Sequence, residues 1–524
     1  MSKNEWWRGG VVYQIYPRSY KSSGAGPVGD LKGITEKLPY IAGLGVDAIW
    51  LSPFFKSPQK DYGYDVSDYR DVDAQFGTLD DFKVLLDKAH KLNLKIIVDL
   101  VMSHTSEDHA WFKESKQDKT NPKADWYVWA DPKPDGSPPN NWLSVFGGSA
   151  WQFNMFRGQY YLHNFLPEQP DLNYHNPDVV DAMLGEAKFW LDFGVDGFRL
   201  DAVNFCTHDK LLRDNPPRSE LGKATQLNFW DLYSMQWHKY DKSQPENLDF
   251  MRRIRKLLDQ YPDRMAVAEI GDDDQTKVAA AYTATPDLLS TAYSFALMSN
   301  KGTMPKASFF RDTLEAQAAE PGDSWPAWAF SNHDVIRAPS RWSGTEYGHD
   351  ARMAKMLITL VGALRGTPFI YQGEELGLPE ADIPFDKICD PWGKFLYPKW
   401  KGRDGCRTPM PWDTKTPDGW LPVPDEHRRL SVAVQDGQAG STLELTREFL
   451  HWRKTQPALI TGDIKFADSG TEDVLLFTRT LGEVEITCEF NLTADPVKGK
   501  GAALQPFEAR FSAKNAVLFS SAKP

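Results

Sequence analysis

Four carboxyl-bearing residues each stand at the end of a short apolar run or just after one. They are Asp99, Asp201, Glu269 and Asp334. Two neighbouring carboxyl groups support a reaction in which one attacks as a nucleophile and the other first donates and then accepts a proton. The sequence therefore offers candidate pairs for nucleophilic and acid–base chemistry.

The segment Gly197-Phe-Arg-Leu-Asp201 is typical of a buried strand that ends in a carboxylate. Side chains alternate along a strand, so Arg199 and Asp201 lie on the same face. A guanidinium beside a carboxylate favours the ionised form that a nucleophile requires. Taken alone, the pair fits a structural ion pair at a strand end equally well.

Glu269 follows the apolar residues 265–268. A carboxyl group in apolar surroundings has a raised pKa, which suits it to donate a proton to a leaving oxygen. The alternative is a surface glutamate at a strand terminus. For Asp334 the alternative is a helix N-cap, and for His104 it is a hydrogen-bonded core histidine. The spacing from Asp99 to His104 is too long for an HExxH-type metal site, so metal ligation is not expected there.

These residues need a frame that brings strand ends together. Short runs rich in β-branched and aromatic residues are typical of strands buried on both faces, as in a parallel sheet. Helices are expected between them, one behind the capping-box-like Thr78-x-x-Asp81 and one beginning near Asn176-Pro177. The alternation predicts an α/β fold, a (β/α)8 TIM barrel, whose catalytic groups lie where strands end. The predicted strands cover residues 11–16, 46–51, 94–99, 194–201, 265–269, 325–330 and 367–371.

Two regions break this alternation. Residues 105–173 are rich in Asp, Pro, Trp, Asn and Gly and are too long for a barrel loop, so they predict an inserted small domain. In the tail, apolar and polar residues alternate over 484–490, which predicts a half-buried antiparallel strand. We expect the barrel to comprise residues 1–104 and 174–449, and an antiparallel C-terminal β-domain to comprise residues 450–524.

The composition is that of an ordinary globular protein. The chain has 524 residues, a formal net charge of −12 and four cysteines. The acidic balance argues against nucleic acid or an anionic membrane as partner, and so few cysteines argue against a disulfide framework. The first residues lack the apolar run of a signal peptide, and no stretch is apolar enough to span a bilayer, so a cytoplasmic location is expected.

The motifs and their order resemble those of the α-amylase family of glycoside hydrolases, specifically its bacterial α-glucosidase and oligo-1,6-glucosidase branch. The resemblance extends from Tyr13-Gln-Ile-Tyr-Pro17 to the β-rich tail. The motifs that carry it are Asp99-Leu-Val-Met-Ser-His104, Gly197-Phe-Arg-Leu-Asp201, Val267-Ala-Glu269, Phe330-Ser-Asn-His-Asp334 and Gln169-Pro-Asp-Leu-Asn173.

The resemblance implies a retaining mechanism, in which the two carboxyl groups stand ~5–5.5 Å apart. Asp201 is then the nucleophile, Glu269 the acid/base, and Asp334 the residue that grips the sugar in subsite −1. Asp61 is expected to pair with Arg407 and close the pocket, which makes the enzyme exo-acting. The other residues implied at the pocket are Tyr64, His104, Phe146, Phe165, Gln169, Arg199 and His333.

Ala202 follows the nucleophile, at a position where relatives that cut α-1,6 bonds tend to carry Val. A smaller side chain here predicts α-1,4 activity on short substrates such as maltose and possibly sucrose. One or two methyl groups are worth only about 1–3 kcal/mol, so this is a preference. Sugar or alcohol acceptors are expected to compete with water, giving transglucosylation.

Two departures from the family pattern concern metals. The segment Ser22-Ser-Gly-Ala-Gly-Pro-Val-Gly-Asp30 has one carboxylate where many relatives have an Asp-rich cation loop. Ser103 stands where relatives with a calcium site carry Asn. No cofactor is therefore expected, and a divalent metal at residues 22–30 is not supported.

Three other functions remain open. Two use the same scaffold and the same covalent intermediate: an oligo-1,6-glucosidase, and a sucrose isomerase or transglucosylase. The third is a non-catalytic relative associated with amino-acid transporters. Members of that class have a membrane anchor and typically a degraded triad, whereas no anchor is expected here and the chain keeps Asp201, Glu269 and Asp334.

Overall fold

The computed structural model describes residues 5–24, 26–218, 232–298, 302–322, 324–345, 347–514 and 516–522. Ala25, within the 22–30 loop, lies outside the described residues. The chain forms two compact units. One comprises Met1–Ser52, Gln75–Ile97 and Tyr293–Pro524, and the other comprises Pro53–Ala74 and Val98–Ala292.

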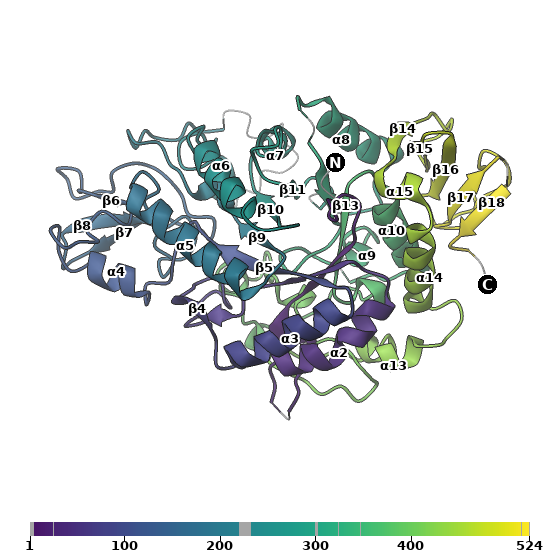
Figure 1. Cartoon of the computed structure of the whole chain (residues 1–524), viewed down its shortest axis with the longest axis horizontal. Coiled ribbons are helices and arrows are strands. Elements are labelled where there is room, and N and C mark those ends of the chain that lie inside the picture. Colours follow the sequence, from purple (N-terminus) through teal and green to yellow (C-terminus); the bar gives the residue numbers. More distant parts are fainter. Residues whose placement is uncertain are drawn as a thin grey trace. The chain divides into compact units, whose positions relative to one another are not determined.

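Eight parallel strands close into a barrel, which confirms the predicted fold class. Several of these strands are labelled in Figure 1. The strands follow one another around the barrel in sequence order, and the last, β13, pairs with the first, β1. The barrel strands are β1 (Val12–Ile15), β2 (Ala48–Leu51), β5 (Lys95–Val101), β9 (Gly197–Asp201), β10 (Met265–Ile270), β11 (Thr291–Ser294), β12 (Pro326–Trp328) and β13 (Thr367–Tyr371).

Every predicted strand overlaps a barrel strand, but β11 was not predicted. Its sequence, Thr-Ala-Tyr-Ser, is four residues long and half polar, so it lacks the apolar run by which the others were recognised. β9 and β10 are buried along their whole length, in keeping with strands covered on both faces.

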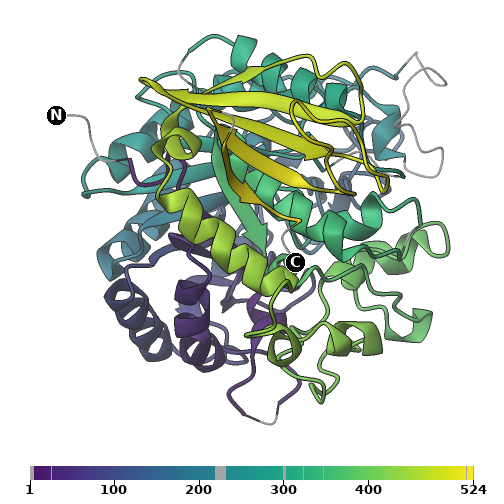
Figure 2. The same ribbon diagram turned by 90° about the vertical axis from the view of Figure 1, so that its right-hand side faces the viewer.

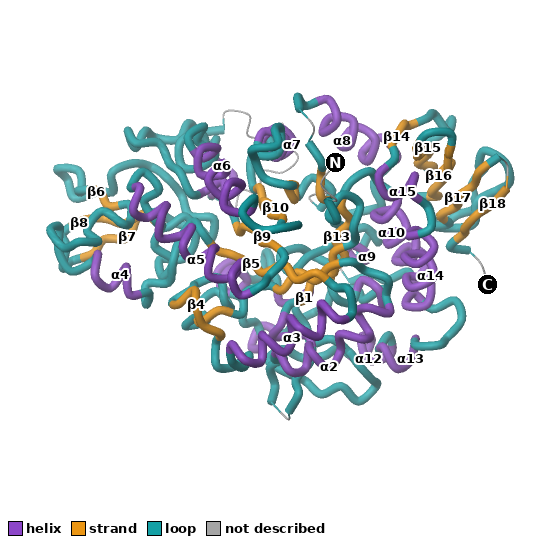
Figure 3. Tube along the Cα trace, in the orientation of Figure 1, coloured by secondary structure: helices purple, strands orange, loops and turns teal. Residues whose placement is uncertain are grey.

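Helices occupy the segments between strands (Figure 3). The predicted capping box of α3 is present, because Thr78 accepts from the Asp81 amide while the Asp81 carboxylate accepts from the Thr78 amide. The Asn176 side chain caps α5 as predicted. In the part of the chain that the structure describes, no helix is long and apolar enough to cross a membrane. The helices are α1 (Pro17–Tyr20), α2 (Leu31–Gly43), α3 (Leu79–Lys91), α4 (Ala110–Ser115), α5 (Pro177–Phe193), α6 (Asn247–Leu258), α7 (Gln275–Ala281), α8 (Ala307–Ala319), α9 (Ala338–Arg341), α10 (Ala351–Ala363), α11 (Pro391–Leu396), α12 (Asp425–Arg429), α13 (Val432–Gln435), α14 (Thr442–Lys454) and α15 (Pro457–Thr461).

The segment predicted as an inserted domain contains a small antiparallel sheet of its own. Its strands β6 (Trp129–Ala130), β8 (Gln159–Leu162) and β7 (Trp151–Asn154) lie in that order. A compact core that includes Trp142 and Trp151 packs against them. A separate two-stranded sheet joins β3 (Phe55–Lys56) and β4 (Asp68–Val72). The exact domain boundaries stay predictions.

The C-terminal sheet is antiparallel, with strands in sequence order (Figure 2). Helix α14 packs on it through aromatic rings, with Phe449 5.6 Å from Phe511 and Trp452 5.1 Å from Phe519. The prediction of a half-buried strand over 484–490 is wrong from Ile486 onward, because both faces are covered there. Even Glu489 is buried, and it accepts a hydrogen bond from the Lys500 amide. The strands are β14 (Asp463–Phe466), β15 (Val474–Leu481), β16 (Val484–Asn491), β17 (Ala509–Ala513) and β18 (Ala516–Ser520).

Two buried arginines fasten this C-terminal region to α10. Arg453 donates to the carbonyl oxygens of Gly362 and Gly9, both at 2.7 Å. Arg479 donates to the Ala363 carbonyl at 2.5 Å, and it also donates to the carbonyls of Leu459 and Gly462. The last-turn carbonyls of α10 are thereby hydrogen-bonded by side chains from α14 and β15.

Candidate active site

Arg199, on β9, is the centre of a buried carboxylate cluster. It is 1% exposed, and its Nη1 atom lies 2.9 Å from Asp99 Oδ1 and 2.6 Å from Asp201 Oδ1. Its Nη2 atom contacts Glu269. Asp99, Asp201 and Glu269 come from three consecutive barrel strands, β5, β9 and β10. One guanidinium therefore holds three of the predicted carboxylates together.

The cluster has more negative than positive charge. Burial raises the pKa of Asp99 to about 6, against the lowering effect of Arg199. Burial by itself lowers the pKa of Arg199, but the charges of Asp99 and Glu269 raise it well above its ordinary value. Arg199 is thus a permanent cation, and its charge favours the ionised form of Asp99 and of Asp201, the proposed nucleophile.

Ala202 adopts a left-handed backbone conformation, with φ 38° and ψ 39°. This turn directs its amide to Glu269, and the Ala202 N–H donates to Glu269 Oε2 at 3.0 Å. The expectation of purely apolar surroundings for Glu269 is therefore wrong. The residues before it are buried, but its carboxylate meets an amide and a guanidinium, neither visible in the local sequence.

A hydrogen-bonded chain joins four of the residues predicted by resemblance. Gln169 Nε2 lies 3.2 Å from Asp61 Oδ2 and 3.2 Å from His104 Nε2. His104 Nε2 also lies 3.0 Å from the Tyr64 carbonyl oxygen, and the Tyr64 hydroxyl donates to Asp99 at 3.2 Å. Burial lowers the pKa of His104 to about 4, so its ring is neutral at neutral pH.

Three aromatic rings, those of Phe165, Phe146 and Phe205, lie near His104 in the same compact unit. Phe165 lies 5.1 Å from the His104 ring and 6.0 Å from Phe146. Phe165 also lies 5.3 Å from Phe205, in the short 3-10 turn Val203–Phe205 that follows Ala202. Phe205 was missed, because one aromatic residue just after a strand has no distinguishing signal.

A second cluster belongs to the other unit and centres on Asp334. The Asp334 carboxylate lies 2.8 Å from Arg407 Nη2, 3.2 Å from Arg403 Nη1 and 3.2 Å from His333 Nε2. Arg407 Nε also donates to the His333 carbonyl at 2.6 Å. Asp334 faces cations instead of the first turn of α9, which removes the helix-cap alternative.

Sequence reasoning missed several neighbours of this cluster. Arg403 holds Asp390, which is fully buried, through Nε and Nη2, with a shortest contact of 2.7 Å. The Gln14 amide lies 2.8 Å from His333 Nδ1, and Tyr16 stacks on the same imidazole at 5.6 Å. Arg403 could have been found, since it stands four residues before Arg407 in the same motif, whereas Asp390 has no local signal.

The predicted residues thus fall into two clusters, one in each compact unit. The first unites Asp61, Tyr64, His104, Phe146, Phe165, Gln169, Arg199, Asp201, Ala202 and Glu269, and the second unites His333, Asp334 and Arg407. The pairing of Asp61 with Arg407 and the separation of the two catalytic carboxyl groups stay predictions.

The two departures from the family's metal patterns have local structural uses. Asp30 caps α2 by accepting from the Gly33 amide, and its other oxygen accepts from the Ser23 amide and hydroxyl. Ser103 Oγ lies 3.0 Å from His104 Nδ1. Within the described ranges, no group of three or more His, Cys, Asp or Glu side chains is arranged to hold a metal ion.

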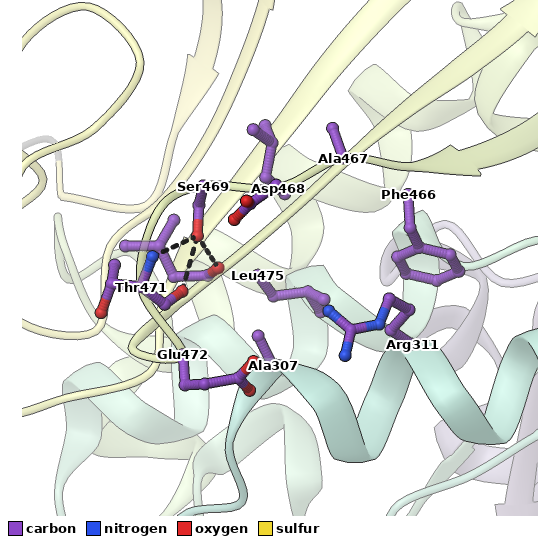
Figure 4. Close-up of a pocket in the computed structure, with 11 residues that line it drawn as sticks. Ala307, Arg311, Phe466, Ala467, Asp468, Ser469, Thr471, Glu472 and Leu475 are labelled. Carbon is purple, nitrogen blue, oxygen red and sulfur yellow. Dashed lines mark hydrogen bonds between the residues drawn. The ribbon is translucent and has the colours of Figure 1, made fainter.

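A small surface hollow lies elsewhere, between α8 and the loop that joins β14 to β15 (Figure 4). Arg311 and Phe466 point into it, while the Ser469 hydroxyl donates hydrogen bonds to the carbonyls of Thr471 in the loop and of Val474 at the start of β15. None of the predicted site residues lines this hollow.

Comparison with known proteins identifies relatives along nearly the whole chain. The family profile described as "Alpha amylase, catalytic domain" matches residues 14–462. A probable alpha-glucosidase of Rhizobium meliloti (strain 1021) is 50% identical over 500 residues, covering 93% of this chain and 90% of that protein. An oligo-1,6-glucosidase of Heyndrickxia coagulans is 37% identical over 535 residues, covering 94% and 93%.

Solved structures agree with these relatives. The alpha-glucosyl transfer enzyme XgtA superposes with a TM-score of 0.93 at 49% identity, covering 96% of this chain and 98% of that one. The trehalulose synthase MutB from Pseudomonas mesoacidophila MX-45 superposes with a TM-score of 0.85 at 31% identity, covering 97% and 99%.

Proposed function

Because this chain belongs to the α-amylase family and is a glycoside hydrolase, we propose that it is an exo-acting, retaining α-glucosidase. The observation that carries this proposal is the contact of one buried guanidinium, that of Arg199, with both Asp201 and Glu269. This arrangement supplies a charged nucleophile and a second carboxyl group to the same small volume.

In the first step, an Asp201 oxygen attacks the anomeric carbon of the terminal glucose while the glycosidic bond breaks. The departing oxygen takes a proton from Glu269. In the second step, Glu269 removes a proton from water or from an acceptor hydroxyl, whose oxygen attacks the anomeric carbon and releases Asp201. Two inversions give net retention.

The remaining residues bind and orient the sugar in this proposal. Asp334, held by Arg403 and Arg407, grips hydroxyl groups of the sugar in subsite −1. Neutral His104 is a hydrogen-bonding partner, and Phe146 and Phe165 offer apolar ring surfaces. Asp61 with Arg407 closes the far end of the pocket, so that only a terminal glucose fits.

Ala202 favours α-1,4 bonds in short substrates such as maltose and sucrose. Transfer to sugar or alcohol hydroxyls is a second expected activity, since a relative at 49% identity is described as an alpha-glucosyl transfer enzyme. Oligo-1,6-glucosidase and sucrose isomerase remain alternatives, because relatives with these or related activities share the fold. The cytoplasmic location stays a prediction.

Product analysis tests this proposal. The purified protein is incubated with maltose, isomaltose, sucrose and trehalose, each with and without an added alcohol, and the first anomer released is read by NMR. We expect α-glucose first, with maltose preferred over isomaltose. An Asp201→Asn variant is expected to lose almost all turnover. Release of β-glucose, or an active Asp201→Asn variant, would contradict the mechanism.

A further inference from the structure

Asp65 is a buried carboxylate in the segment that presents two of the proposed pocket residues. Its side chain is 0% exposed, although it follows the polar-looking sequence Asp61-Tyr-Gly-Tyr64. Burial raises its pKa to about 6, so the group is ionised at neutral pH. A buried charge is costly unless donors surround it.

Three hydrogen-bond donors surround the Asp65 carboxylate, and all lie within residues 57–61, in the turn that leads to Asp65. The Lys60 amide donates to Asp65 Oδ2 at 2.8 Å, and the Asp61 amide donates to Oδ1 at 3.1 Å. The Ser57 hydroxyl also donates to Oδ1, at 2.9 Å. Asp65 is thus the shared acceptor for the backbone immediately before and at Asp61.

This turn needs such an acceptor because its backbone is unusual. Gln59 and Tyr62 have φ of 66° and 51°, in the left-handed region that non-glycine residues rarely adopt. Gly63 has φ 111°, and a Cβ there would lie 3.1 Å from both Cβ and the carbonyl oxygen of Pro53. Conformations of this kind persist only where surrounding contacts determine them.

The turn formed by residues 57–65 contributes two residues, Asp61 and Tyr64, to the first cluster. Asp61 accepts a hydrogen bond from Gln169. The Tyr64 carbonyl lies within hydrogen-bonding distance of His104, and the Tyr64 hydroxyl donates to Asp99. A displacement of the backbone at residues 60–61 therefore moves groups that bind the sugar.

We propose that Asp65 is a positioning residue for sugar recognition, which holds the backbone at Lys60 and Asp61 so that Asp61 and Tyr64 face the glucose in subsite −1. The inference rests on the proposed function, because it assigns sugar contacts to Asp61 and Tyr64. Asp65 touches neither the nucleophile nor the acid/base in the contacts described above. Its loss should weaken binding more than chemistry.

Asp65→Ala and Asp65→Asn test this. Binding that is equal in ground and transition states appears in KM, so we expect KM for p-nitrophenyl α-glucoside to rise about tenfold or more in Asp65→Ala, with kcat changed less than about threefold. Asp65→Asn keeps one acceptor oxygen and should be intermediate. Backbone hydrogen exchange over residues 57–65 should accelerate in both variants.

Asp196→Asn is the matched control. Asp196 is a buried aspartate just before β9, at the strand end opposite Asp201, and it lies 3.4 Å from Arg264. A merely structural role for Asp65 would give the result expected for this control, a lower melting temperature with KM unchanged. That outcome for both Asp65 variants would overturn the inference.

A double-substitution cycle separates this inference from the proposed function. If Asp65 acts through Asp61, adding Asp65→Ala to Asp61→Ala should change kcat/KM much less than Asp65→Ala does alone. Fully additive losses would overturn the positioning role. If Asp61→Ala alone leaves KM for p-nitrophenyl α-glucoside unchanged, the pocket role proposed for Asp61 is wrong instead.

Discussion

The backbone amide of Ala202 donates a 3.0 Å hydrogen bond to Glu269, so the residue after the proposed nucleophile holds the proposed acid/base. The bond depends on the left-handed conformation of Ala202. Left-handed backbone is strongly disfavoured for β-branched side chains. The side chain at position 202 and the placement of Glu269 are therefore linked, beyond any effect of side-chain size on the acceptor sugar.

Ala202→Val should consequently do two things. It should raise the ratio of isomaltose to maltose cleavage about 10-fold. One or two methyl groups beside the substrate change the relative activation free energies by about 1–3 kcal/mol. It should also lower kcat on both substrates, because the strained turn displaces the amide from Glu269. The measurement is kcat/KM on each disaccharide. Ala202→Gly, which relieves the φ strain, should keep the wild-type kcat, and an unaltered isomaltose to maltose ratio in Ala202→Val would refute the specificity argument.

Arg199→Lys should abolish activity and destabilise the fold. A lysine ammonium is a point charge without the planar fork that reaches Asp99, Asp201 and Glu269 together. Breaking a buried ion pair costs about 3–5 kcal/mol. Urea unfolding measures the stability, and maltose turnover measures activity.

Lys188→Ala is the control. It removes an exposed ion pair with Asp192 and should cost less than about 1 kcal/mol. Equal losses in the two variants would contradict the cluster's importance.

Arg403 and Asp390 should behave as one unit. Arg403→Gln removes the guanidinium that holds the fully buried Asp390, so it is expected to cost about 3–5 kcal/mol. Asp390→Asn is expected to cost less, because Arg403 keeps its 3.2 Å contact with Asp334. The double variant should lose less than the sum of the two. Urea unfolding of all four proteins gives the coupling free energy. A coupling near zero would show that Asp390 does not neutralise Arg403.

Asp171 should make the fold less stable as pH rises. Burial raises the pKa of its carboxyl to about 8, with Asn164 as its hydrogen-bonding partner. Between the ordinary pKa of an unfolded aspartate, about 4, and pH 8, the folded chain keeps a proton that the unfolded chain releases. The free energy of unfolding therefore falls through this window, by at most about 1.4 kcal/mol per pH unit.

Urea unfolding at pH 5 and pH 8 checks this for the wild type and for Asp171→Asn. The variant has no titrating group at this position, so its stability should fall less between the two pH values. An equal fall in both proteins would contradict the raised pKa of Asp171.

The barrel could be predicted because strands buried on both faces show continuous apolar runs, and only the half-polar β11 escaped this signal. The proposed catalytic residues could be named from their type and order along the chain. Their surroundings could not, since Arg199 meets Asp99 and Glu269 across long stretches of sequence. Asp65 and Asp390 stand in polar segments that are typical of exposed loops, and only tertiary packing makes them buried acceptors.

The hydrogen bonds from Arg453 and Arg479 to the end of α10 bear on how this chain is synthesised. During translation, the carbonyl of Gly362 gains its donor once residue 453 has left the ribosome, but that of Ala363 waits for residue 479. A truncated product that ends before β15 would contain every proposed catalytic residue and still lack the Arg479 donor at the end of α10. Proteases are expected to remove such fragments, and a fusion partner replacing the C-terminal sheet would have to supply equivalent donors.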